Sequence, residues 1–314
     1  MSAVAGASGI DLAALAELGI GPELIAARER LDGERALEFL AELPQLAAHW
    51  QQRLGCRDAR MLPGGVLSAA LACRDGSERR VLKLSARGAT SARAEAAALR
   101  AWGGVGACRL RWASDDGRVM LLDAIDPGTP ISPGEDAADA RRAAALLRGL
   151  HGVQPFPAAV PDAAEELRWR FERARTHLDG PSHARGMISH EQIAAAHAAT
   201  LALHGRRTET VLLHGDFIDK NLLLDSAGEW WAIDPRPCLG DPCLDAGFWA
   251  LCHRPGVAVR PRCELIAETA DLDPGRVWAW AQAFAVSEAV LVRDLPRARA
   301  YAGVAGGSTS EATR

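Results

Sequence analysis

The chain has 314 residues and a mass of 33.4 kDa, a length that favours two lobes or one large domain. With 48% hydrophobic and 24% charged residues the composition is that of a globular protein, which argues against a disordered chain or a coiled coil. The net charge of −4 gives no basic surface for nucleic acid and tolerates a cationic small substrate, and without a membrane-spanning stretch or a signal peptide we expect a cytoplasmic protein with no membrane partner.

The first part of the chain predicts a small sheet accompanied by helices. We expect residues 1–20 to be flexible and residues 21–123 to form a first lobe. Apolar residues at three- and four-residue spacing over 24–46 predict two amphipathic helices ahead of the sheet. Apolar runs bounded by glycine turns predict strands at 61–62, 66–73, 80–84, 107–112 and 119–122, and an alanine-rich run predicts a helix at 91–102.

The rest of the chain is mostly helical in pattern. After a Pro-Gly-Thr-Pro break at 127–130, residues 124–305 are expected to form a second lobe and 306–314 a disordered tail. Helices are predicted at 137–151, 163–178, 191–204, 244–253 and 277–292, and short strands at 211–214, 222–224 and 230–233. The expected class is therefore α+β, with a small β-rich N-lobe and a larger, mainly helical C-lobe.

The most informative motif is His214-Gly215-Asp216 with Asn221 and Asp234. Asn221 follows Asp216 by five residues, and Asp234 follows Asn221 by thirteen, across a predicted hairpin. This order and spacing match the catalytic loop and metal-binding segment of kinases. Phosphoryl transfer needs a carboxylate to orient and deprotonate a hydroxyl, and hard oxygen ligands for Mg²⁺ on ATP. Asp216 is thus the candidate base, and Asn221 and Asp234 are the candidate metal ligands.

A purely structural alternative exists for this motif. Asp and Asn residues in a β-hairpin commonly do no more than stabilise turns. Any one of these residues alone would favour that alternative. Their combination, with apolar strands on both sides of each polar cluster, favours the kinase-like site.

Lysine is scarce in this chain, and its positions are informative. Of the 36 basic residues only Lys83 and Lys220 are lysines, and the rest are arginines. Lys83 lies inside an apolar strand, and Glu95 lies on the next predicted helix. In a kinase-like lobe such a lysine contacts the α- and β-phosphates of ATP and pairs with a helix glutamate. The alternative for Lys83 is a solvent-facing lysine at a strand edge.

Three further positions have two interpretations each. The glycine turn at 62–68 either covers the phosphates or is an ordinary turn, since it lacks a Walker lysine. The strand over 119–123 would connect the lobes and, ending at Asp123, offer backbone groups to adenine, or it simply ends at a loop. Lys220 either neutralises charge on the transferred phosphoryl group or is a solvated loop lysine.

Other polar and sulfur-containing residues are interpreted as structural. Asp241 and Asp245 are expected to order the loop and cap the next helix rather than to contact substrate, and His151 and His253 are expected to be satisfied histidines. The seven cysteines lack a CxxC pair, which argues against disulfides and favours buried thiols. A zinc site among the cysteines at 238–263 with His253 is the less favoured alternative, because structural zinc usually brings ligands at CxxC-like spacing.

Across residues 34–295 the sequence resembles the aminoglycoside/hydroxyurea antibiotic phosphotransferases, which have a protein-kinase-like fold, and within them the streptomycin 6-kinase branch. The resemblance rests on the segments 98–104, 119–123, 213–216 with Asn221, 231–235 and 240–242. It implies a kinase that uses ATP and Mg²⁺, with Asp216 as base, Asn221 and Asp234 on the metal, and Lys83, Glu95 and Asp123 at the nucleotide. Two departures are Asp123, where the family often has glutamate, and the Phe217–Lys220 stretch, which lacks the histidine frequent in this branch.

The acceptor that the resemblance implies is the 6-hydroxyl of streptomycin. A guanidinium-rich acceptor calls for carboxylates, and Asp219, Asp241 and Asp245 are the candidates by position. Hydroxyurea or a metabolic alcohol is the alternative acceptor, which a site with few carboxylates would favour. A kinase-shaped binding module without turnover is the third hypothesis. The choice between ATP and GTP and the oligomeric state are left open.

Overall fold

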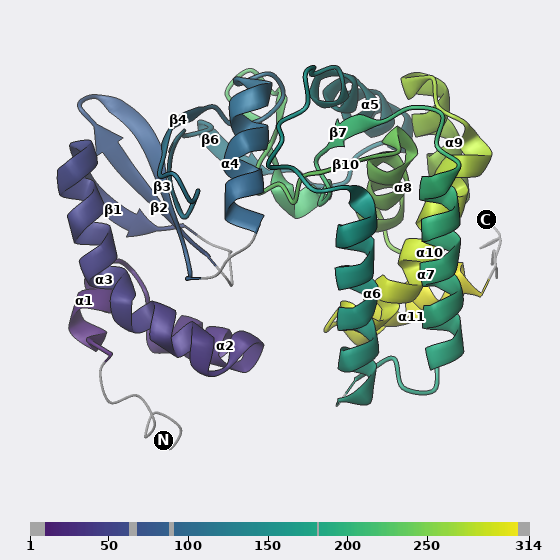
Figure 1. The fold of residues 1–314 in the computed structure, drawn as a ribbon, viewed down its shortest axis with the longest axis horizontal. Helices are drawn as coiled ribbons and strands as arrows, with labels where there is room; N and C mark the ends of the chain where they lie inside the picture. Colours follow the sequence, from purple (N-terminus) through teal and green to yellow (C-terminus); the bar gives the residue numbers. More distant parts are fainter. Residues whose placement is uncertain (1–9, 63–67, 88–90, 181, 307–314) are drawn as a thin grey trace. The chain divides into compact units, whose positions relative to one another are not determined.

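The computed structural model describes residues 10–62, 68–87, 91–180 and 182–306, which fall into two compact units (Figure 1). The first unit comprises residues up to 104 together with 108–124, and the second comprises 105–107 and the chain from 125 onward. No helix of the described residues is both long enough and apolar enough to cross a membrane.

The first unit is built on a five-stranded antiparallel sheet in the order β1-β2-β3-β5-β4. Three helices precede the sheet in the chain, and a fourth is inserted between β3 and β4. The strands are β1 (Cys56–Met61), β2 (Ser68–Asp75), β3 (Glu78–Ser85), β4 (Leu110–Ala113) and β5 (Val119–Asp123), and the helices are α1 (Leu12–Glu17), α2 (Pro22–Asp32), α3 (Glu34–Leu54) and α4 (Ser91–Trp102).

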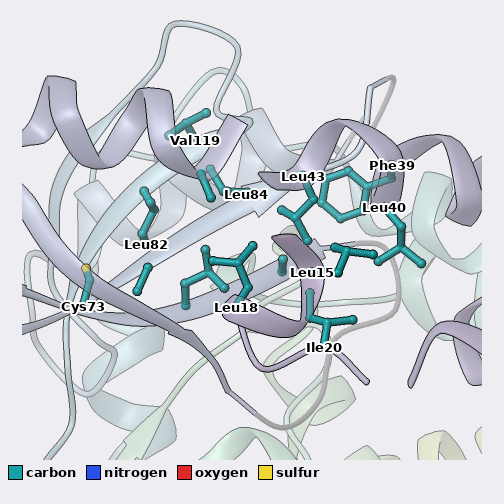
Figure 2. Close-up of a cluster of buried hydrophobic side chains, with 14 of the residues drawn as sticks. Leu15, Leu18, Ile20, Phe39, Leu40, Leu43, Cys73, Leu82, Leu84 and Val119 are labelled. Atoms are coloured by element: carbon teal, nitrogen blue, oxygen red, sulfur yellow. The ribbon is translucent and has the colours of Figure 1, made fainter. Parts of the chain in front are cut away.

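The core of this unit forms where α1 and α3 pack against the sheet (Figure 2). Leu40 and Leu43 on α3 are fully buried, as is Leu15 on α1. They join Leu82 and Leu84 of β3, whose side chains have no solvent exposure. The three- and four-residue spacing on α3 and the alternation on the strands thus bury one apolar face of each element, which fixes the strand that carries Lys83.

The second unit is mainly helical and holds two small antiparallel sheets. One sheet contains β6 (Pro127–Pro130), β8 (Leu222–Asp225) and β9 (Trp230–Ala232); the other pairs β7 (Val211–Leu213) with β10 (Cys238–Gly240). The helices are α5 (Asp136–His151), α6 (Ala163–Asp179), α7 (His190–Gly205), α8 (Pro242–His253), α9 (Val259–Ala270), α10 (Pro274–Leu291) and α11 (Leu295–Ala305), and a 3₁₀ turn, η1, spans Asp219–Asn221.

Nearly all the elements expected from the sequence are present, with local differences. The strand expected at 61–62 begins earlier, at Cys56, and the strand expected at 107–112 lies at Leu110–Ala113. The break at 127–130 is itself strand β6, which lies at the edge of its sheet, where prolines are tolerated. Short strand β10 and helices α9 and α11 lie in segments for which the sequence pattern predicts no element. The expectation that residues 1–20 are flexible is wrong for the part that the structure describes, because α1 forms there and packs Leu15 into the core. Most of the expected glycine turn at 62–68 and of the expected tail at 306–314 lies outside the described residues. Six of the seven cysteines are buried free thiols and the seventh, Cys252, is partly buried, as expected.

Candidate active site

Lys83 and Glu95 form a buried ion pair in the first unit. Lys83 Nζ lies 2.5 Å from Glu95 Oε1, and each side chain is only 7% exposed. β3 positions the lysine in the centre of the sheet, where Ala70 and Met120 flank it on the neighbouring strands. α4 presents the glutamate among buried alanines and Leu99. Lys83 is therefore no solvent-facing edge lysine, because it lies on an interior strand and is paired.

Asp123 ends β5 and is tied into the sheet. Its carboxylate accepts hydrogen bonds from Arg111 Nε at 2.7 Å and lies 2.7 Å from Arg80 Nη1. Its backbone N–H donates to the Arg109 carbonyl at 2.9 Å. The side chain thus holds neighbouring strands together, and any contact between Asp123 and a nucleotide would not use its N–H group.

In the second unit, residues 214–221 connect β7 to β8 and are called the Asp216 loop below. Gly215 turns the chain with φ of +74°. A Cβ at this position would lie 1.9 Å from the Arg236 carbonyl oxygen, so only glycine fits. This turn directs the chain from a buried strand to Asp216, whose side chain is 15% exposed.

Asn221 fixes the Asp216 side chain. Its Nδ2 donates to Asp216 Oδ2 at 2.7 Å and to the Asp216 carbonyl at 2.9 Å. Because the amide nitrogen is used in this way, Oδ1 is the Asn221 atom left to face a cation, and no donor among the described residues bonds to it. Lys220 is 67% exposed, with Nζ 3.5 Å from Asp216 Oδ2, so it is both solvated and adjacent to the carboxylate.

The segment that carries Asp234 crosses directly behind the Asp216 loop. Ile233 N donates to the Asn221 carbonyl at 2.9 Å, and Arg236 N donates to the His214 carbonyl at 2.9 Å. The β8–β9 hairpin makes this crossing, since Leu222 pairs with Ala232. Asp234 itself is exposed, in the left-handed region with φ of +54°. The hairpin thus gathers Asp216, Asn221 and Asp234 into one neighbourhood, as their spacing predicts.

His214 lies buried beneath the Asp216 loop, next to Asp245. Burial lowers the pKa of His214, and the nearby carboxylates of Asp245, Asp216 and Asp234 oppose this effect only in part. A neutral ring fits the bonds, because Nδ1 accepts from Asp216 N at 3.3 Å and Nε2 faces the Ile233 carbonyl at 3.1 Å. His214 therefore supports Asp216 as a hydrogen-bonding group without charge.

Asp245 binds the start of the loop from α8. Its oxygens accept from the His214 and Gly215 amides at 2.8 and 2.9 Å, and His151 Nε2 lies 3.1 Å from it. Burial alone would raise the pKa of Asp245, but the His151 contact and the donated bonds hold it below its usual value. Asp245 thus orders the loop, as the sequence predicts.

The three carboxylates that are candidates for binding a cationic acceptor are all engaged inside the protein. Asp245 is fully buried. Asp241 caps α8 by accepting from Cys243 N, and it also accepts from Arg276 Nε and Trp280 Nε1. Asp219 is hydrogen-bonded to His253. These contacts argue against a guanidinium group at Asp241 or Asp245, which are buried and bonded, whereas Asp219 faces His253 and is still 19% exposed.

A further charged pair near the Asp216 loop has no signal in the sequence. Arg170 Nη1 on α6 lies 2.5 Å from Glu288 Oε1 on α10. Burial raises the pKa of Glu288, which Arg170 lowers and the charge of Asp216 raises further. The two residues lie 118 positions apart, so only the packing of α6 against α10 brings them together.

With this geometry established, comparison with known proteins identifies the family. Residues 62–295 match the aminoglycoside/hydroxyurea antibiotic resistance kinases. The chain belongs to this family. It is therefore a phosphotransferase that uses a hydroxyl group as acceptor, and the kinase interpretation of the sequence is confirmed.

The chain is similar in sequence to two characterised relatives and in fold to a solved structure. The chain is 31% identical over 266 residues to the streptomycin 6-kinase of Streptomyces griseus, covering 80% of this chain and 83% of that protein. It is 34% identical over 277 residues to the hydroxyurea phosphotransferase of Kitasatospora aureofaciens, covering 83% and 76%. The choline kinase LicA of Streptococcus pneumoniae, solved with AMP, has a TM-score of 0.61 at 10% identity, covering 83% of this chain and 98% of that chain. The protein-kinase-like fold is thus confirmed.

Proposed function

We propose that this kinase transfers the γ-phosphoryl group of ATP to a hydroxyl of an antibiotic, with Asp216 as the base. The observation that carries the proposal is the bond from Asn221 Nδ2 to Asp216 Oδ2 at 2.7 Å, within a loop fixed by Asp245. This bond aims one carboxylate oxygen and leaves the other available to accept the acceptor's proton.

The remaining roles follow from donor chemistry. The oxygens of Asn221 and Asp234 are the hard ligands that Mg²⁺ prefers, so these side chains fit a magnesium ion that neutralises charge on the ATP phosphates. Lys83, held by Glu95 at 2.5 Å, is assigned to the α- and β-phosphates. Asp123 is assigned to the nucleotide only through the backbone at the end of β5, since its carboxylate and N–H group are engaged.

Two acceptors are proposed in order. Streptomycin is the first, in line with the S. griseus relative and with the segments over which the sequence resembles that branch. Hydroxyurea is the second, in line with the Kitasatospora relative, and one structural observation favours it. Asp219, Asp241 and Asp245 are occupied by internal donors, whereas a small neutral acceptor needs no such carboxylates.

The test is acceptor-dependent release of ADP from Mg-ATP. We expect activity with one of the two acceptors and a fall of at least about 10³-fold in kcat for Asp216→Asn, with ATP binding retained, because the variant keeps the shape but loses the base. Activity with hydroxyurea alone would exchange the order of the acceptors. Full turnover by Asp216→Asn would contradict the assigned role, and ATP binding without turnover on any acceptor would indicate the binding module.

A further inference from the structure

His253 is a buried histidine at the end of α8 with a carboxylate on each side. Its side chain has no solvent exposure. Nδ1 lies 2.8 Å from Asp219 Oδ1 and 3.0 Å from Oδ2, and Nε2 lies 3.1 Å from Asp139 Oδ2. The ring also stacks on Trp249, with centroids 4.5 Å apart. Each ring nitrogen is thus within hydrogen-bond distance of a carboxylate oxygen.

The first of these carboxylates belongs to the Asp216 loop. Asp219 begins the 3₁₀ turn η1, three residues after the proposed base and two before Asn221. Few backbone hydrogen bonds hold this turn: Asn221 N donates to the Ile218 carbonyl at 2.8 Å, and Leu222 N donates to the Asp219 carbonyl. The contact with His253 therefore fixes a part of the loop that its backbone alone holds weakly.

The second carboxylate anchors the histidine to α5. Asp139 lies in the first turn of that helix, is 5% exposed, and accepts from Gly134 N at 2.6 Å. Because its partner is itself fixed to a helix, His253 cannot follow a displacement of the loop without breaking a buried bond. Such a bond is costly to break, because it leaves a buried polar group unsatisfied.

The other end of the loop is held by a similar arrangement. Asp245, in the first turn of α8, binds the amides of His214 and Gly215, and His151, the last residue of α5, bonds to Asp245. At the opposite ends of the same helices, His253, the last residue of α8, bonds to Asp139 in the first turn of α5. The two ends of the Asp216 loop are thus attached to the same two helices.

We propose that His253 is a positioning residue for phosphoryl transfer, which holds Asp219 and thereby sets the positions of Asp216 and Asn221. The proposal rests on the function assigned above to Asp216. Positioning matters for this step because a misplacement of about 1 Å at reacting groups can cost about 10²-fold in rate. His253 touches no reacting atom, so its effect passes through the loop.

The principal test compares His253→Phe with the wild type. Phenylalanine keeps the ring on Trp249 but removes both hydrogen bonds. We expect kcat at saturating ATP and acceptor to fall about 10- to 100-fold. His253→Gln, which retains a donor, should recover part of kcat, whereas recovery of stability without recovery of kcat would contradict a positioning role.

A matched control is available in the same unit. His204 on α7 is a buried histidine, 7% exposed, that bonds to the partly exposed carboxylate of Asp162 at 2.7 Å. The pair has no hydrogen bond to residues 214–221. His204→Phe should lower the melting temperature and leave kcat within about twofold. An equal fall in kcat for both variants would overturn the proposal, because loss of stability would then explain it.

A second measurement does not depend on turnover. Hydrogen exchange of the backbone amides in residues 214–221 should accelerate in His253→Phe and remain unchanged in His204→Phe, since only the first variant releases the loop. Unchanged exchange in His253→Phe would overturn the attachment itself. If the wild type shows no activity with any acceptor, the proposed function fails, and faster exchange in His253→Phe would still support the attachment of the loop.

Discussion

Gly215 precedes the proposed base, and its backbone conformation determines where that base lies. At φ of +74° a Cβ would meet the Arg236 carbonyl at 1.9 Å. Gly215→Ala should therefore lower the free energy of unfolding by about 3 kcal/mol and displace the Asp216 loop, so that kcat falls even in the folded fraction. Urea denaturation and kcat at saturating substrates measure the two effects.

Gly228 gives a control for the contribution of backbone strain. It has φ of +80°, but nothing lies within 4 Å of its Cβ position. Gly228→Ala therefore carries the strain without the collision, and a loss of about 1 kcal/mol with unchanged kcat is expected. Equal effects of the two substitutions would show that the approach of Arg236 to Gly215 does not control the loop.

At this same scale the sequence predicted the proximity of the candidate site residues better than it predicted the residues that support them. Asp216, Asn221 and Asp234 lie within one loop and the following hairpin, so their spacing alone indicates their proximity. His253 lies 34 residues from Asp219 and 114 from Asp139, and only the packing of α8 and α5 joins them. A sequence pattern can therefore place His253 at the end of a helix, but it cannot show that Asp219 and Asp139 are its hydrogen-bond partners.

At the scale of elements, helix α8 depends on its N-cap residue for more than the cap itself. Asp241 accepts from Cys243 N and also from Arg276 and Trp280 of α10, and its side chain is 3% exposed. Asp241→Ala should lower the free energy of unfolding by about 3 kcal/mol, because a cap and a largely buried ion pair are lost together.

An exposed helix cap provides the comparison for this effect. Asp294 caps α11 by accepting from Arg297 N and makes no other side-chain bond among the described residues. Asp294→Ala should cost about 1 kcal/mol, which is the usual value for a cap. Chemical denaturation of both variants tests the difference. Equal losses would indicate that the bonds from Asp241 to α10 contribute nothing to stability.

The two strands that escaped prediction are stabilised by the strands with which they pair. Helices α3 and α4 carry a regular apolar spacing and are predicted correctly. Strand β10 has three residues and exists because it pairs with β7, while β6 contains two prolines and depends on β8. Neither has the alternation or length that marks a strand in the sequence.

At the scale of the whole chain, the division into a β-rich and a helical unit follows from the change in periodicity after residue 124. The family then follows from the motifs, which are local. The identity of the acceptor does not follow from the motifs, because the carboxylates expected to bind a cationic substrate make hydrogen bonds within the protein. The sequence shows which residues are charged, but it does not show whether a charged side chain faces a ligand or another helix, because that depends on tertiary packing.

Binding of Mg-ATP should stabilise the whole chain in a way that depends on Asp234. At a concentration of about 100 times Kd the nucleotide contributes about 2.7 kcal/mol, which corresponds to a rise in melting temperature of about 5 °C or more. Removal of Mg²⁺ with EDTA, or Asp234→Asn, should abolish most of this rise, because the metal ligand is lost. Asp225 lies in the same hairpin, but its carboxylate accepts from Ala227 N, Glu229 N and Trp231 Nε1. Asp225→Asn should therefore lower the melting temperature itself and keep the increment from Mg-ATP, and loss of the increment in both variants would contradict the assignment of Asp234 to the metal.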